Sequence, residues 1–377
     1  MLRHLKRAPT LLLLVSVAAL AGCNKDAAKG GDKTEADKPA QTADADTKDA
    51  DADKKDAAPA WEWTLPKGLK APEVPADNPM SAAKVALGHK LFFDKRLSGD
   101  GSRSCYSCHQ NQLGNADGRA KALGAGDKEL SRNTPTIWNV AYHSALYWDG
   151  RAPSLEKQMI GAWKGGNMGA GDGVEAKAKE IGALDEYRAD FRAVFGLGDG
   201  DDVTPEHVAQ AISAYERTLL CGDSPWDNNA LEGDAQAGWE LFRGKAACAT
   251  CHAGPSLSDG LFHNVGIAVA DGGDIGHGKV SGNEADNFKF RTPTLRGVGE
   301  TAPYFHDGSV SDLREAVKYM ASGGDRKVEG LDENFADRGL SDAEVDQLVA
   351  FLQTLKCPND LEVIGEQSVP GIDAPQG

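Results

Sequence analysis

Two copies of the motif C-x-x-C-H constrain this sequence more than any other feature. The first copy spans residues 105–109 (CYSCH) and the second spans residues 248–252 (CATCH). At this spacing two thiols can each add to one vinyl group of the same porphyrin, and the histidine that follows is directed at the iron. One copy alone also occurs in redox and zinc sites, whereas two copies predict two covalent c-type haems. The attachment cysteines are then Cys105, Cys108, Cys248 and Cys251, and the proximal ligands are His109 and His252.

The start of the chain has the organisation of a bacterial export signal. A basic stretch at residues 3–7 precedes an apolar run at residues 11–20, which is too short to span a membrane. The sequence LAGC at residues 20–23 resembles the lipobox of lipoproteins. Residues 1–22 are therefore predicted to be a signal peptide, and Cys23 the lipidated first residue of a periplasmic protein anchored to the envelope. An ordinary signal peptide with an incidental cysteine is the alternative.

The segment at residues 23–60 is predicted to be a disordered tether. It is rich in Asp, Lys and Ala, and the first large apolar side chain after Cys23 is Trp61. Such a segment cannot bury enough apolar surface to offset the entropy lost on ordering the chain. Its length would let the folded part stand away from a membrane surface.

The charge of the chain bears on its partners. The formal net charge is −16. Nucleic acid phosphates would be repelled by such a chain, so a nucleic acid partner is not expected. A basic partner protein that docks by electrostatic attraction is compatible with this charge.

The remaining cysteines raise the question of a disulfide. The chain has seven cysteines. Four are assigned to haem and Cys23 to lipid, which leaves Cys221 and Cys357. In an oxidising compartment two such thiols suggest a disulfide between the middle of the chain and its end. Two free buried thiols are the alternative, because sequence does not show how closely the two backbones approach.

The patterning predicts an all-α, loop-rich fold with two cytochrome c-like domains. We place the first haem domain at residues 61–230, the second at 231–357 and a tail at 358–377. Glycine is frequent between residues 110 and 200, which favours short helices and long loops over a sheet. Ser81, Asp234 and Ser341 are the expected N-caps, and Glu344 completes a capping box with Ser341. The expected helices cover residues 82–93, 205–220, 235–243, 313–320 and 342–355.

Several further segments, together with the two haem motifs, resemble one known family. These segments are ALG at 86–88, LFFD at 91–94, RNTPT at 132–136, WDGR at 148–151, RTPTLR at 291–296 and APYFHDG at 302–308. The chain is similar over residues 80–356 to the bacterial di-haem cytochrome c peroxidases and the related methylamine-utilisation (MauG) di-haem enzymes. The resemblance implies that peroxide reacts at the first haem and that a small cytochrome or cupredoxin delivers electrons to the second. Members of the family often form homodimers.

The resemblance also implies roles for individual residues. Met320 stands where the peroxidases place the methionine ligand of the second haem, which suits a haem that accepts electrons. The MauG branch has a tyrosine there, so the neighbouring Tyr319 is the alternative, and core packing is the plain role for Met320. Trp148 matches a tryptophan between the two haems that can carry electrons or serve only in packing. Calcium is implied by one set of oxygen ligands, from the side chain of Asn133 and the carbonyls of Thr301 and Pro303.

On the distal side of the first haem the sequence departs from the family. Ala125 stands where the peroxidases have a histidine that closes this haem in the resting state, which implies an open haem; His143 is a fallback ligand. Gln158 matches the family's distal glutamine. Asn167 stands where the family has a glutamate that moves a proton, and asparagine cannot act as an acid or base. Glu156 and Glu175 are candidate substitutes.

Three functions follow. The first is a peroxidase that reduces hydrogen peroxide to water. The second is a MauG-like oxidase that modifies a residue of a partner protein, which Ala125 favours and Met320 disfavours. The third is a di-haem electron carrier without turnover, which Asn167 favours and an open iron disfavours.

Overall fold

The computed structural model describes residues 61–267, 273–324 and 328–358. The predicted signal peptide, Cys23, the whole tether and residues 359–377 of the tail lie outside the described residues. Among the described residues, no helix has the length and apolar character needed to cross a bilayer.

The predicted all-α, loop-rich fold is confirmed. In the described part of the chain the strands β1 (Phe262–His263) and β2 (Phe290–Arg291) form one short antiparallel pair, in which Phe262 is opposite Arg291. The helices are α1 (Ala82–Phe92), α2 (Leu155–Lys164), α3 (Val174–Ala183), α4 (Asp185–Phe195), α5 (Pro205–Glu216), α6 (Gly233–Arg243), α7 (Gly278–Ser281), α8 (Leu313–Ser322) and α9 (Asp342–Gln353).

The first haem motif follows a close crossing of two helices. The Ser81 hydroxyl accepts from the Lys84 N–H at 3.2 Å and caps α1 as predicted. Gly88 lies where α1 meets α5, and a Cβ atom there would be 1.9 Å from the carbonyl oxygen of Ala211. Because only glycine fits at this contact, the two backbones can approach closely. The crossing leads the chain from α1 directly toward residues 105–109.

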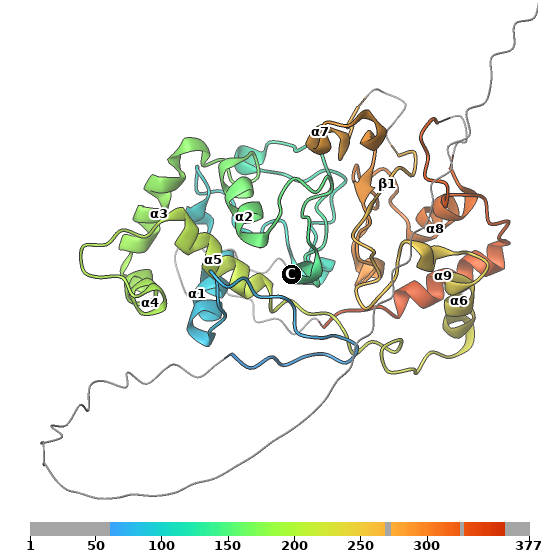
Figure 1. Cartoon of the computed structure of the whole chain (residues 1–377), viewed down its shortest axis with the longest axis horizontal. Helices are drawn as coiled ribbons and strands as arrows, with labels where there is room; N and C mark the ends of the chain where they lie inside the picture. Colours follow the sequence, from blue (N-terminus) through green and yellow to red (C-terminus); the bar gives the residue numbers. More distant parts are fainter. Residues whose placement is uncertain (1–60, 268–272, 325–327, 359–377) are drawn as a thin grey trace, which may run out of the picture. The chain divides into compact units, whose positions relative to one another are not determined.

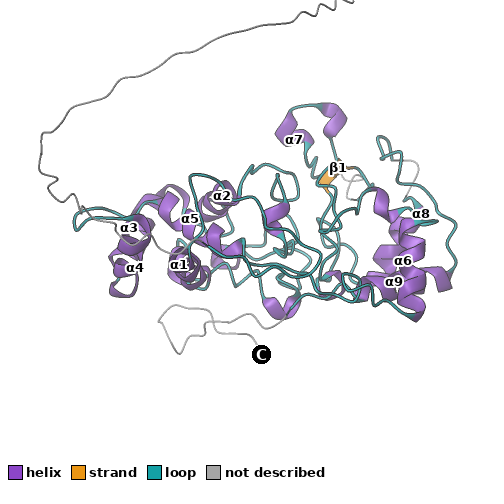
Figure 2. Ribbon diagram, turned by 60° about the horizontal axis from the view of Figure 1, so that its bottom comes forward, coloured by secondary structure: helices purple, strands orange, loops and turns teal. Residues whose placement is uncertain are grey.

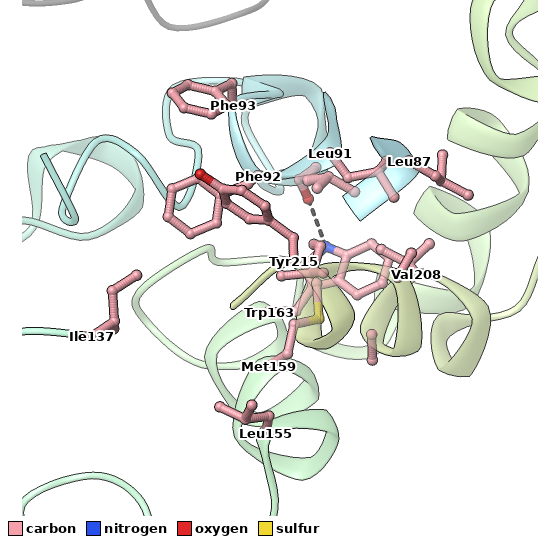
Figure 3. Close-up of a cluster of buried hydrophobic side chains, with 14 of the residues drawn as sticks. Leu87, Leu91, Phe92, Phe93, Ile137, Leu155, Met159, Trp163, Val208 and Tyr215 are labelled. Carbon is pink, nitrogen blue, oxygen red and sulfur yellow. Dashed lines mark hydrogen bonds between the residues drawn. The ribbon is translucent and has the colours of Figure 1, made fainter. Parts of the chain in front are cut away.

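Figure 3 shows the apolar core that surrounds this crossing. Side chains from α1 and α5 meet those of α2, and the Trp163 indole N–H donates to the carbonyl of Leu97 at 2.6 Å. The largest contributors are fully or almost fully buried: Leu87, Leu91, Phe92, Met159, Trp163, Val208 and Ile212.

The second haem motif follows a crossing of the same kind. Helix α6 packs on α9, and a Cβ atom at Gly238 would be 1.9 Å from the carbonyl oxygen of Gln347. The predicted capping box of α9 is confirmed, since the Ser341 hydroxyl accepts from the Glu344 N–H and the Glu344 carboxylate accepts from the Ser341 N–H. A second core surrounds this pair, built from Phe242, Leu257, Leu348, Phe351, Leu352 and Leu355.

Two predicted helix boundaries are wrong. Helix α6 begins at Gly233 with Glu232 at its N-cap, so Asp234 lies in the first turn, where a negative charge faces the positive end of the helix dipole. Helix α5 ends at Glu216 rather than near residue 220. There the chain turns away to bind another segment, because the carbonyl of Leu219 accepts from the Asn139 N–H at 2.9 Å.

Figures 1 and 2 both place the helices of the two halves apart. Helices α1 to α5 gather on one side, α6, α8 and α9 gather on the other, and mostly loop lies between them. The loop region contains the contacts that join the halves, including an ion pair of Arg132 with Asp274.

A disulfide also joins the two halves. Cys221 and Cys357 are bonded, with their Cα atoms 4.9 Å apart, so the structure contains the first of the two alternatives left open by the sequence. Cys221 is fully buried beside the first core, and Asn139 bonds its backbone N–H and carbonyl at 2.8 and 2.9 Å. The disulfide fixes the end of the second half against the first.

Removing this disulfide should destabilise the protein strongly. It closes a sequence separation of 136 residues, so the double variant Cys221→Ser, Cys357→Ser should lose about 2–5 kcal/mol of unfolding free energy. The measurement is the urea midpoint of variant and wild type with and without a thiol reductant. Reductant should bring the wild type to the midpoint of the variant; equal midpoints without reductant would contradict the expectation.

Candidate haem sites

The first motif forms one helical turn that ends at His109. The carbonyl of Cys105 accepts from the N–H groups of Cys108 and His109 at 3.2 and 3.0 Å. The turn is anchored by Tyr106, which is buried and donates its hydroxyl to Asn111 at 2.9 Å. Both cysteines are half-buried, and neither is part of a disulfide. Burial raises the pKa of the Cys108 thiol to about 12, so the unattached cysteine is a neutral thiol.

The second motif repeats this geometry. The carbonyl of Cys248 accepts from the N–H groups of Cys251 and His252 at 3.3 and 2.9 Å. Burial raises the pKa of the Cys248 thiol to about 11. Since both motifs fold into the same turn, each presents two thiols and one imidazole on a half-buried surface.

Both proximal histidines are held by a backbone carbonyl. The Nδ1 atom of His109 is 2.9 Å from the carbonyl oxygen of Asn115, and Nδ1 of His252 is 2.9 Å from that of Leu257. A carbonyl can only accept, so Nδ1 carries the proton and Nε2 keeps its lone pair for a metal. Burial lowers the pKa of both imidazoles, which keeps them neutral as iron ligands must be.

A large cavity opens at the second motif. Its walls contain His252, both cysteines of the motif and Met320, together with apolar side chains such as Phe242, Leu295, Leu313, Val317, Leu348 and Leu352. Tyr319, the alternative to Met320, donates its hydroxyl to the carbonyl of Val265 at 2.7 Å. The residues fit a covalent haem: apolar walls, two thiols, a neutral imidazole and one thioether. Met320 as the second iron ligand stays a prediction.

The structure brings Ala125 and Asn167 together. The Ala125 N–H donates to the carbonyls of Gly166 and Asn167 at 3.1 Å each, so the loop around Ala125 lies against the loop around Asn167. A Cβ atom at Gly124 would be 2.0 Å from the carbonyl oxygen of Gly166, which shows how closely the loops pack. Gln158 lies on α2, half-buried, and its carbonyl accepts from the Tyr147 hydroxyl at 2.9 Å.

The substitutes considered for these distal residues lie elsewhere. Glu156 is bound by Asn78 and Arg217, each at 2.7 Å, and Glu175 is exposed on α3. His143 lines the cavity of the second motif, and burial followed by the charge of Arg291 lowers its pKa to about 3. Its place in this cavity wall does not favour His143 as a fallback ligand of the first haem, which stays a prediction.

Trp148 lies at the boundary of the two halves. It is 9% exposed, lines the second cavity and donates its indole N–H to the carbonyl of Asn133 at 2.9 Å. The carbonyls of Trp148 and Asp149 accept from the Arg291 N–H at 2.8 Å and from Nδ1 of His277 at 2.9 Å. The second half thus fixes the backbone of Trp148, a contact that no local sequence signal indicates.

The three residues of the predicted calcium site line the same cavity. The Nδ2 atom of Asn133 donates to the carbonyl of Arg119 at 2.7 Å. This bond does not use Oδ1, the atom that would bind calcium. Thr301 and Pro303 follow the turn at residues 298–300. The structure places the three residues in one wall, and calcium binding there stays a prediction.

A buried acid near the first motif was missed from the sequence. Glu216 is 6% exposed, and its Oε2 atom has no hydrogen-bond partner among the described residues. Burial raises its pKa to about 8. Its charge adds to the effect of burial in raising the pKa of the Cys105 thiol, so the two side chains lie within electrostatic reach of each other. Its position at the end of α5 gave no signal in the sequence.

The fold and the two sites define a c-type cytochrome with two haems. A family model described as di-haem cytochrome c peroxidase matches residues 82–236, and a cytochrome c model matches residues 235–356. The chain is 38% identical to the methylamine utilization protein MauG of Methylorubrum extorquens, over 75% of this chain and 80% of that protein. It is 33% identical to the cytochrome c551 peroxidase of Pseudomonas aeruginosa, over 74% of this chain and 80% of that one.

A solved structure agrees. A MauG-like protein associated with microbial copper homeostasis superposes with a TM-score of 0.74 at 34% identity, covering 79% of this chain and 96% of that one. The chain belongs to the di-haem cytochrome c peroxidase and MauG family of oxidoreductases. It therefore carries two covalently bound c-type haems.

The buried Glu216 should give the protein a characteristic pH dependence. Between about pH 4.5 and 8 the folded protein holds a proton on Glu216 that the unfolded chain has released, so this residue lowers stability as the pH rises. Glu216→Gln removes that effect. The unfolding free energy of the variant minus that of wild type should therefore be larger at pH 8 than at pH 5, by on the order of 3 kcal/mol.

Urea midpoints of wild type and variant at both pH values measure this gain. Glu175→Gln is the matched control, because it makes the same substitution at an exposed carboxyl. A Glu216→Gln variant whose advantage does not grow with pH would show that Glu216 is ionised in the folded protein.

Proposed function

We propose that this protein is a periplasmic peroxidase that reduces hydrogen peroxide to water with electrons from a small cytochrome or cupredoxin. Each turnover combines one peroxide with two electrons and two protons and releases two waters. The observation that carries the proposal is the position of Met320 in the cavity of the second motif, while the hydroxyl of Tyr319 is bonded to Val265. When bound, the two haems supply the redox chemistry, one accepting donor electrons and one reducing peroxide.

The residues around each site divide these tasks. Met320 and His252 are the residues that would hold the iron of the second haem, and an iron held by two protein ligands would favour electron transfer over peroxide binding. On the distal side of the first site the small side chain of Ala125 leaves room for peroxide, and Gln158 is the candidate to orient it. Trp148, held between the halves, is the candidate bridge for electrons.

The distal side of the first haem site lacks the family's acidic residue for proton transfer to peroxide. Asn167 takes the position at which the family has a glutamate, and an amide neither donates nor accepts a proton at neutral pH. Loss of a positioned proton carrier typically lowers a rate by about 10²–10⁴. We therefore expect peroxide reduction that is slow for this family and that relies on water for protons.

The second candidate is a MauG-like oxidase that modifies a residue of a partner protein. Its support is Ala125, which removes the need for reductive opening, and the 38% identity to a MauG protein. The thioether of Met320 in the second cavity favours the peroxidase. An electron carrier without turnover remains the third candidate, with Asn167 as its support.

The location and the remaining partners are also part of the proposal. We infer that Cys23 carries a lipid, that the segment after it tethers the folded part to the envelope, and that residues 61–230 and 231–357 are two haem domains. Calcium at Asn133, Thr301 and Pro303 would join the first half to the second. A homodimer is expected from the family.

Purified protein with both haems should consume hydrogen peroxide when a reduced small cytochrome is supplied. The rate should exceed that of free haem at equal concentration. Because Ala125 cannot bind iron, the fully oxidised protein should react with peroxide as fast as the half-reduced protein. Stopped-flow mixing of both forms with peroxide measures this.

The competing candidates give different results in the same assay. Turnover no faster than free haem would reject the peroxidase. Peroxide consumption that needs no donor and leaves an oxidised residue on a partner protein would identify the MauG-like oxidase.

Restoring the carboxylate should accelerate the reaction. Asn167→Glu places an acid at the distal position and should raise the second-order rate constant for peroxide by about 10²-fold or more. Asn167→Gln is the matched control, since it adds the same length without a titrating group. If both variants react at the same rate, Asn167 does not limit proton delivery.

A further inference from the structure

Arg291 is a buried cation in the wall of the second haem cavity. It ends β2, is 6% exposed and lines the cavity together with both motif cysteines and His252. Burial alone lowers its pKa, to about 10, so the guanidinium is still charged at neutral pH. A charge in such a place needs a counter-ion, because removing an ion from water is expensive unless it is paired.

Arg291 has no counter-ion among the described residues, whereas other buried arginines do. Arg217 forms an ion pair with Glu156 at 2.7 Å, and Arg296 pairs with Asp227 at 2.5 Å. The side chain of Arg291 donates only to backbone carbonyls, Nε to Tyr147 at 3.5 Å and Nη1 to Thr292 at 3.2 Å. A guanidinium has five N–H donors, so most of its hydrogen-bonding capacity is unused.

Two neutral polar groups in the same cavity wall are also unsatisfied. Thr134 Oγ1 and His306 Nε2 are buried and have no hydrogen-bond partner within the described residues. His306 is 4% exposed, and its ring stacks on Phe290, the neighbour of Arg291, with centroids 3.6 Å apart. Burial, ahead of the nearby charges, lowers the pKa of His306 to about 4, so it is a neutral hydrogen-bonding group.

Two other basic side chains of this cavity differ from Arg291: His263 has carboxylate partners, and Arg338 is only half-buried, so solvent can screen its charge. His263 bonds Asp332 and Asp259 at 2.6 and 3.0 Å, and Arg338 donates to the carbonyl of Asn334. Among the described residues of this cavity wall, the buried side chains without a full set of hydrogen-bond partners are therefore Arg291, Thr134 and His306. The missing group must be an anion with several acceptor atoms that enters the cavity with the cofactor.

We infer that Arg291 is the counter-ion of a propionate carboxylate of the second haem. Arginine and a carboxylate form two parallel hydrogen bonds, and the guanidinium of Arg291 has N–H groups left to form them. Thr134 and His306 supply further bonds to the propionates. The inference rests on the haem that is attached at Cys248 and Cys251 and does not depend on the proposed peroxidase activity.

This pairing sets the reduction potential of the second haem. A positive charge beside the macrocycle favours the reduced iron, which carries one positive charge less. Arg291 also donates its backbone N–H to the carbonyl of Trp148 at 2.8 Å. The residue that holds the propionate therefore also holds the backbone of the proposed bridge between the haems.

The test compares Arg291→Gln and Arg291→Lys with wild type, each isolated with both haems attached. The potential of each haem is measured by redox titration followed by electron paramagnetic resonance, and the propionate bending bands by resonance Raman spectroscopy. In Arg291→Gln the ratio of reduced to oxidised second haem at fixed ambient potential should fall about tenfold, or about 59 mV for one electron. The first haem should be unchanged.

Arg151→Gln is the matched control. Arg151 stacks on the Tyr147 ring at 3.4 Å, but its side chain is 45% exposed, so solvent screens the charge that it removes. The control should shift the ratio less than twofold and leave the propionate bands in place. An equal shift in both variants, or a shift of the first haem alone, would overturn the inference.

The Raman bands separate a direct bond from a distant charge. Arg291→Lys keeps the positive charge but cannot form the two parallel hydrogen bonds of a guanidinium. The reduction potential of the second haem should therefore change little, while its propionate band shifts. An unchanged band in Arg291→Lys would overturn the inference, even if Arg291→Gln cannot be isolated with both haems.

Discussion

The close crossing of two helices at a glycine is the constraint on which both haem sites depend. Gly88 lets α1 touch the backbone of α5, and Gly238 lets α6 touch that of α9. A side chain at either position would push the helices apart and move the motif that follows. Because each motif is a single turn with its imidazole held by one carbonyl, a displacement of the preceding helix would be passed directly to the iron ligand. The two crossings are therefore the repeated unit from which the protein is built.

The two sites use this common unit for different chemistry. In the second half, α8 brings the thioether of Met320 to the cavity that His252 also lines, so both side chains could hold the iron there. In the first half, the two glycine-rich loops around Ala125 and Asn167 are in backbone contact with each other. The proximal histidines are held in the same way, so we propose that the two sites differ in function through their distal sides. We propose that the distal side of the first site, where the resemblance places Ala125 and Asn167 at the positions of a histidine and a glutamate, decides how this chain reacts with peroxide.

The attachment residues could be predicted from the sequence because their chemistry requires fixed spacing. Helix positions followed from periodicity and caps, with errors where tertiary contacts ended a helix early, as at Glu216. Cys221 and Cys357 could only be suggested as a pair, since their approach depends on how the halves meet. Arg291 and His277 could not be predicted, because their partners on the Trp148 segment lie more than 120 positions away in the chain. The place of His143 in the wall of the second cavity could not be predicted either, since sequence does not indicate which site a loop residue lines.

The boundary between the halves holds Trp148, the residue that we propose as the electron bridge. Trp148 is positioned by an acceptor in its own half, the Asn133 carbonyl, and by donors from the other half, Arg291 and His277. Asn133 in turn donates its side chain to Arg119 and its backbone N–H to the carbonyl of His306, beside the polar groups that lack partners in the second cavity. Filling that cavity with a charged cofactor would satisfy Arg291 and stiffen the same segment. Haem attachment in the second half would then order the route by which electrons reach the first, and the unpaired arginine is the residue that links the two events.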